Sequence, residues 1–417
     1  MRIGIAGPIG TPDIEHLLDG DTRALPREMK GATLLGTLIA SLIGLGHEVV
    51  AFTTDPALEP RRNNRVVAHG NRFAIHYVPR RRHGLRRDRG ARGRMVDLFA
   101  LERHALQSAI VEAHPDIVHA HWSYEFGWAA LDSGIPCLLT CHDSPWDILK
   151  IQPDLYRLGR LFMAQSVLRR ARFSTVVSPY LLDSLRRMTR AHLDVVPNPV
   201  SDDLFERGCE RVSADWSSRP PRIAMILNGW SARKNPEPAM RALQAVRAVY
   251  PGAQMHLIGP GFGPDERAAA WASERGLVDQ FVFHGWLPYA QAMDQLATMD
   301  LLVHPALEES FGMTIAEAMA LGVPVVAGKD SGAVPWVCGG DRNAGLLVDV
   351  RASNAIVTAI GDLLGNASLY ERCSREGRTR VRNHFAATAV ARSYLEHYRR
   401  VLHISGATTA LASGTET

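Results

Sequence analysis

Cysteines and lysines are few in this 417-residue sequence, and no apolar run is long. The five cysteines are odd in number and form no Cys-x-x-Cys pair, which argues against a disulfide framework or a structural zinc site and predicts free thiols. The longest apolar stretch, residues 32–45, falls short of the roughly 20 residues of a bilayer-spanning helix and predicts a buried core helix. The start MRIGIAGPIG lacks the pattern of a signal peptide, which predicts a cytoplasmic protein.

Positive charge is concentrated in the first half of the chain. Residues 1–200 hold 26 Lys+Arg against 20 Asp+Glu, and eight arginines lie between Arg80 and Arg94, opposed there only by Asp88. Two interpretations stay open for this cluster: a solvated loop, or attraction to a phosphorylated acceptor or to an anionic surface on the inner face of the membrane. Nucleic acid is not an expected partner, because no aromatic residues are interleaved with the arginines and no known module accompanies them.

Short apolar runs alternate with longer amphipathic segments, which predicts parallel βαβ units. One series begins at RIGIAG and a second begins at RIAMIL (222–227), and the turn-rich segment 195–205 separates them. The fold class expected is therefore α/β, with two Rossmann-like, doubly wound parallel-sheet domains. The predicted parts are 1–200, 201–384, a helix over 385–403 that packs on either domain, and a disordered tail over 404–417.

The richest group of polar residues after any expected strand is in HPALEESFGMTIAEAMALGVPVV. Ligands of open α/β sheets bind beyond the carboxyl ends of the strands, and free amide groups at a helix start bind phosphate. Glu309 precedes the expected helix and is predicted to face a donor sugar. Glu317, inside the helix, is placed to accept hydrogen bonds from two ribose hydroxyls. The alternative is two ordinary carboxylates near a helix start, complementing its dipole.

This segment resembles the retaining glycosyltransferases of group one (family four), whose two Rossmann-like domains form the GT-B fold around a central cleft. The resemblance covers roughly residues 1–403 and is stronger in the second half. It implies transfer of a sugar from a nucleoside-diphosphate sugar to a sugar, lipid-linked or small-molecule acceptor, in glycan, glycolipid or glycoconjugate synthesis. Glu309 and Glu317 match the family's paired glutamates. The family's loop at the sugar and diphosphate corresponds to Ser310, Phe311, Gly312, Met313 and Thr314.

A second match is NGWSARKN (228–235), where Lys234 corresponds to the family's lysine and is one of four lysines in the chain. Its expected task is to neutralise charge on the departing diphosphate in place of a metal ion, so no metal or other cofactor is expected. The family's Gly-Arg pair reads Asn228-Gly229 here. Arg233 is the candidate that supplies the missing guanidinium, although its spacing differs from that of the family's arginine.

In the first domain the resemblance points to His142 in LLTCHD as the histidine that faces the reactive side of the sugar. Asp143 and His121 are weaker candidates for acceptor binding, and His119 can equally be a core histidine. Gly31, which opens the first long helix, best matches the family's glycine-rich loop near the donor phosphates. The preceding loop, roughly 8–30, is expected to help form the acceptor pocket.

A metal role for Asp19-Gly20-Asp21 is not expected, because this pattern lies after the first strand and is a common turn sequence. Two rival functions stay open. One is a nucleotide-sugar epimerase or hydrolase on the same fold, and the other is a non-catalytic nucleotide-sugar-binding scaffold. Neither the base, the donor sugar nor the acceptor can be identified from side chains, although FHGWLP (283–288) is expected near the base.

Overall fold

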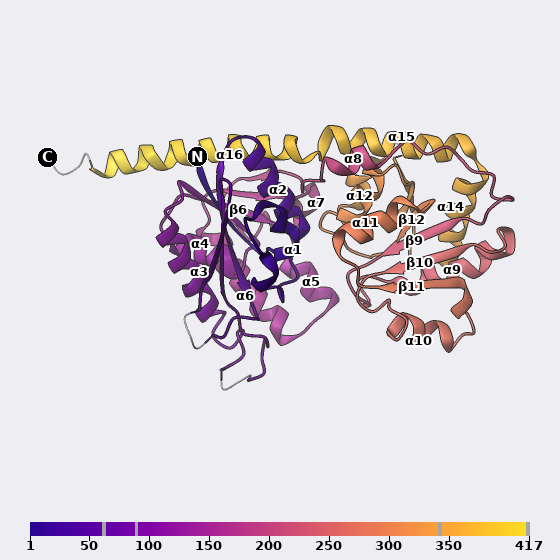
Figure 1. Ribbon diagram of the computed structural model, residues 1–417, viewed down its shortest axis with the longest axis horizontal. Helices are drawn as coiled ribbons and strands as arrows, with labels where there is room; N and C mark the ends of the chain where they lie inside the picture. The colour runs from indigo at the N-terminus through magenta and orange to yellow at the C-terminus, as the bar shows by residue number, and fades with distance from the viewer. Residues whose placement is uncertain (61–63, 88–90, 341–343, 414–417) are drawn as a thin grey trace. The chain divides into compact units, whose positions relative to one another are not determined.

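The computed structural model describes residues 1–60, 64–87, 91–340 and 344–413, and divides into two compact α/β units. Unit 1 comprises Met1–Pro199 and Ala387–Thr417, and unit 2 comprises Val200–Ala386. Figure 1 shows a sheet flanked by helices in each. The C-terminal helix α16 (Ala387–Ser413) thus belongs to unit 1.

The sheet of unit 1 has eight strands in the order β3-β4-β2-β1-β5-β6-β7-β8, parallel except for β3. Its central strands are apolar on both faces, as expected for a parallel sheet covered by helices on each side. The strands are β1 (Arg2–Ala6), β2 (Glu48–Asp55), β3 (Val66–Gly70), β4 (Phe73–Pro79), β5 (Ile117–His121), β6 (Cys137–Cys141), β7 (Ser174–Val176) and β8 (Leu193–Val195).

Helix α2 packs against α16, and α3 packs against α4, which also contacts α6. Helix α2 is the buried core helix predicted from the apolar stretch at 32–45. The helices of unit 1 are α1 (Thr11–Ile14), α2 (Thr33–Gly44), α3 (Ala100–Ala113), α4 (Glu125–Asp132), α5 (Pro145–Ile151), α6 (Leu155–Arg170), α7 (Pro179–Leu185) and α16, with short 3₁₀ helices at Glu15–Leu17 and Thr22–Ala24.

Unit 2 has a six-stranded parallel sheet in the order β11-β10-β9-β12-β13-β14. Its strands are β9 (Arg222–Ile226), β10 (Gln254–Ile258), β11 (Phe281–Gly285), β12 (Leu301–His304), β13 (Val325–Gly328) and β14 (Leu346–Val348). Its helices are α8 (Asp203–Arg207), α9 (Pro236–Val249), α10 (Arg267–Ser273), α11 (Tyr289–Ala297), α12 (Met313–Ala320), α13 (Val334–Val337), α14 (Ser353–Gly365) and α15 (Ala367–His384). Helices α9 and α14 pack together over one large apolar core.

The structure differs from the sequence-based expectation at several segments. An amphipathic segment at 95–113 predicts a helix, but α3 begins only at Ala100, because Leu98 and Phe99 adopt positive φ angles that a helix cannot continue through. The expected loop 8–30 contains short helical turns. Helix α16 continues to Ser413, where disorder was expected from 404, and the alanines and leucine of this stretch favour helix. Residues 414–417 lie outside the described residues.

All five cysteines are free thiols, as predicted. Within the described residues, no helix combines the length and apolar character needed to cross a membrane.

Candidate functional site

Three buried charged or polar side chains of unit 2 meet where β9 and β12 end. Lys234 Nζ donates to Glu309 Oε1 at 2.5 Å, and His304 Nε2 donates to the same oxygen at 3.0 Å. Burial alone raises the pKa of a carboxyl, but here the Lys234 ammonium and the His304 hydrogen bond outweigh it and hold the pKa of Glu309 far below its usual range. Glu309 is therefore an anion at any working pH.

The loop that carries Lys234 is tied to the loop that carries Glu309. Asn235 adopts a left-handed backbone conformation just before α9, and its side chain donates to the carbonyl oxygens of Pro305 and Val350, both at 3.0 Å. The Leu307 N–H donates to the Arg233 carbonyl at 2.8 Å. These bonds fix the backbone on both sides of the Lys234–Glu309 pair, which is pre-organised as a result.

Glycine is required at position 312, immediately before α12. Its φ of +96° is strained for other residues, and a Cβ would lie 3.3 Å from Ile315 Cδ1. Met313 and Thr314 are half-buried in the first turn of α12. The helix start predicted from the sequence therefore exists, with Glu309 four residues before it. Phe311 instead packs edge-on against Trp336 and Phe385, so its side chain serves the core.

Glu317 lies inside α12 and is only 4% exposed. Burial raises the pKa of Glu317 to about 7, and a hydrogen bond with Tyr289 of α11 partly opposes this rise. Without a ligand the site thus holds a carboxyl whose ionisation near neutral pH is costly. A donor of two hydrogen bonds, such as a vicinal diol, would stabilise the ionised form.

Arg233 points to a different carboxylate from its neighbour Lys234. Its guanidinium pairs with Glu308 at 2.9 Å, and Ser310 Oγ donates to the other Glu308 oxygen at 3.4 Å. Burial raises the pKa of Glu308, and Arg233 partly offsets that rise. In this structure the charge of Arg233 is matched by Glu308, so a diphosphate would share the guanidinium with that carboxylate.

In unit 1 the predicted histidines follow the neighbouring strands β5 and β6. His121 Nδ1 lies 2.8 Å from His142 Nε2, and Trp122 stacks on the His142 ring. His121 Nε2 is buried with no partner. His142 Nδ1 is buried as well, and the contact between the two rings is a single N–H···N hydrogen bond in which one ring donates and the other accepts. Burial lowers the pKa of His142 to about 3, partly opposed by Asn198, so the ring is neutral.

The remaining predicted residues of unit 1 have clear local partners. His119 is fully buried and forms hydrogen bonds with Tyr398 and Thr140, both at 2.7 Å. It is therefore a core histidine, one of the two roles that the sequence left open. Asp143 accepts a hydrogen bond from Tyr124 at 2.8 Å.

Gly31 packs so closely on Gly10 and Asp13 that an added Cβ would lie 2.1 Å from Gly10 N. This close packing is a structural reason for glycine at position 31, whether or not a phosphate also approaches it. In the Asp19-Gly20-Asp21 turn, the Asp21 carboxylate caps the 3₁₀ helix Thr22–Ala24 and pairs with Arg23.

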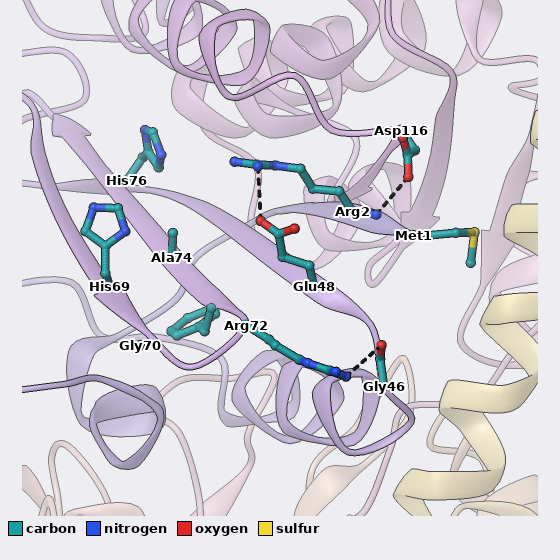
Figure 2. Close-up of a pocket in the computed structure, with 11 residues that line it drawn as sticks. Met1, Arg2, Gly46, Glu48, His69, Gly70, Arg72, Ala74, His76 and Asp116 are labelled. Carbon is teal, nitrogen blue, oxygen red and sulfur yellow. Dashed lines mark hydrogen bonds and ion pairs between the residues drawn. The ribbon is translucent and has the colours of Figure 1, made fainter.

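One pocket of unit 1 lies far from these strand ends. It encloses about 860 Å³ at the amino ends of β1, β2 and β4, the opposite edge of the sheet from His121 and His142. Figure 2 shows that the Arg2 guanidinium pairs with Glu48, that the Arg2 backbone N–H donates to Asp116, and that Arg72 donates to the Gly46 carbonyl.

Two family models match the chain. The model of Glycosyltransferase Family 4 matches residues 31–204, and that of Glycosyl transferases group 1 matches residues 215–380. The chain belongs to the group 1 glycosyltransferases. The transferase is 29% identical over 306 residues to 2-deoxystreptamine N-acetyl-D-glucosaminyltransferase of Streptomyces fradiae, covering 68% of this chain and 71% of the relative.

Solved structures confirm the predicted GT-B fold of this transferase. Sucrose-phosphate synthase from Thermosynechococcus elongatus superimposes with a TM-score of 0.74 at 20% identity, over 97% of this chain and 100% of that one. HepE of Anabaena, in complex with UDP, gives a TM-score of 0.64 at 17% identity, over 96% of this chain and 100% of that one. The chain is thus an enzyme that transfers sugars on two Rossmann-like domains.

Three residues near the predicted site were missed by sequence reasoning: His304, Glu308 and Tyr289. His304 ends β12, and a polar residue at the carboxyl end of a parallel strand was the available signal. Glu308 directly precedes Glu309 in the sequence. Tyr289 belongs to α11, and nothing in the sequence links it to Glu317.

Proposed function

We propose that this glycosyltransferase takes its sugar from a nucleoside-diphosphate donor held by unit 2, and transfers it with retention of configuration to a hydroxyl group of an acceptor bound by unit 1. The buried Lys234–Glu309 pair beside the start of α12 carries the proposal. It offers a cation for the diphosphate, a carboxylate for the sugar and free helix N–H groups, while Glu317 suits the ribose. The UDP complex of HepE supports the donor class.

We further propose that no metal ion is needed, because the Lys234 ammonium supplies the positive charge that a metal would bring to the leaving group. Activity that survives exhaustive chelation supports this proposal, and activity that requires an added divalent cation contradicts it.

Donor screening followed by product analysis tests the function. A panel of nucleoside-diphosphate sugars is first screened by thermal shift, since a ligand of the native state raises the melting temperature. The best donor is then incubated with candidate acceptors, and the products are resolved by NMR. We expect free nucleoside diphosphate and a glycoside with the anomeric configuration of the donor. Formation of a new nucleotide sugar would indicate an epimerase. Release of free sugar at the same rate with and without an acceptor would indicate a hydrolase. Donor binding without turnover would indicate a non-catalytic scaffold.

Replacing His121 by phenylalanine distinguishes two roles for that residue. The 2.8 Å contact to His142 and the 1% exposure of His121 favour a positioning role, in which the variant lowers kcat about tenfold while the acceptor KM stays unchanged. A direct acceptor contact predicts instead a raised acceptor KM at constant kcat. Steady-state kinetics with varied acceptor decide between them, and the melting temperature of the variant checks that the fold is retained.

A further inference from the structure

The arginine cluster at 80–94 separates into two groups in the structure. Arg81 is 6% exposed and pairs with Asp97 at 2.8 Å and with the fully buried Glu102 at 2.6 Å. Arg82 pairs with Glu28 at 2.6 Å. Arg94 donates to the backbone carbonyl oxygens of Arg81 and Arg82. These three arginines stabilise the loop. Carboxylates neutralise Arg81 and Arg82, and backbone carbonyl oxygens accept the hydrogen bonds of Arg94.

Arg80, Arg86 and Arg92 form the second group. Within the described ranges, no carboxylate lies at ion-pair distance from any of them. Arg80 is half-buried: its guanidinium contacts Met29 Sδ at 3.4 Å, and its Nε is buried without a partner. Burial and the neighbouring Arg94 lower the pKa of Arg80, and the negative charges of Glu125 and Glu102 offset only part of this fall.

These three side chains line one pocket of about 150 Å³. It lies where β2 and β4 end, at the carboxyl edge of the unit 1 sheet, where ligands of such sheets bind. Among the described residues that line the pocket, Glu59 is the one carboxylate, so positive charge is in excess there. The buried Arg81 fixes the shape of the pocket, because it also donates to the Arg92 carbonyl at 3.3 Å.

We propose that this pocket binds a phosphate group carried by the acceptor. The proposal deepens the function given above, since it names the class of acceptor. Guanidinium groups bind phosphate oxygens through paired hydrogen bonds, and three arginines line this pocket. The pocket is smaller than a typical site for a whole small molecule, which suits a single anionic group. A concave site favours one phosphate over the flat contact that a membrane surface makes.

Calorimetric titration of the full-length protein with inorganic phosphate tests the site, with nucleoside diphosphate present to occupy the donor site. The test variant is R80Q/R86Q/R92Q. The matched control is Arg87→Gln, because Arg87 is exposed in the same segment but does not line the pocket. We expect the triple variant to weaken phosphate binding at least tenfold and the control to bind like the wild type. Equal loss in both variants, or no loss in the triple variant, overturns the proposal.

Vesicles containing phosphatidylserine separate the phosphate site from a membrane surface. We expect no vesicle binding that depends on Arg80, Arg86 and Arg92. If these arginines govern vesicle binding while phosphate affinity stays constant, the membrane alternative replaces the proposal. Nucleotide-sugar binding by the triple variant should equal that of the wild type. Phosphate binding is measured without turnover. If phosphate does not bind, the proposal for the sugar donor still stands. If no sugar is transferred, the phosphate titration still tests the pocket.

Discussion

Replacing Lys234 by methionine is expected to lower kcat by about 10²–10³-fold, the cost of removing one preorganised group that stabilises transition-state charge. The variant keeps the apolar stem and removes the ammonium that contacts Glu309 at 2.5 Å. It should also lower the free energy of unfolding by about 3 kcal/mol, because a buried carboxylate loses its charged partner and keeps only His304. Steady-state kinetics and denaturant unfolding measure the two effects.

A double variant separates catalysis from stability. Lys234→Met combined with Glu309→Gln removes both charges, so it should recover most of the lost stability and none of the lost activity. Lys150→Met is the matched control: this lysine pairs with Asp147 at the surface of unit 1 and is 58% exposed, and its loss should change neither quantity measurably. A Lys234→Met enzyme with kcat within threefold of wild type would remove the lysine from the mechanism.

Replacing Glu317 by glutamine should stabilise the protein while it weakens donor binding. The pKa of this carboxyl rises from 4.5 to about 7 on folding. Between these values the unfolded chain binds fewer protons than the folded chain, so the free energy of unfolding falls as pH rises and stays low above pH 7. Glutamine removes this cost. At pH 8 the variant should therefore gain up to ~3 kcal/mol over wild type, and at pH 5 the gain should be small.

The same substitution tests the ribose contact. A charged hydrogen-bond acceptor contributes about 1.5–3 kcal/mol, so nucleotide-sugar affinity at pH 8 should fall roughly 10- to 100-fold. Thermal melts at both pH values and donor titration give the two readouts. Glu274→Gln, on an exposed residue of unit 2, should alter neither. Equal donor affinity in wild type and Glu317→Gln would contradict the assignment, as would a loss of stability at pH 8.

Sequence pattern was sufficient for the fold class and for the helix start that follows Glu309. Alternating apolar runs predict parallel strands because burial on both faces demands such runs, and both sheets follow that pattern. The short strands β3 and β8 escaped prediction. β3 is an edge strand of partly exposed residues, and β8 has only three residues. Neither therefore shows a clear pattern of apolar residues in the sequence. The spacing of Glu309, Gly312 and Glu317 is local, and a helix start follows from it directly.

What a charged residue contacts across loops was decided only by the tertiary structure. Eight arginines at 80–94 look alike in the sequence, yet Arg81 pairs with Asp97 and Glu102, whereas Arg80 has no carboxylate at ion-pair distance among the described residues. The segments around Glu309 and Lys234 could be predicted from the sequence, because their residues are neighbours in sequence or match a family motif. The pKa of Glu317 depends on burial under α11, and the pairing of Arg233 with Glu308 spans 75 positions. Such contacts arise from chain folding, which no local pattern records.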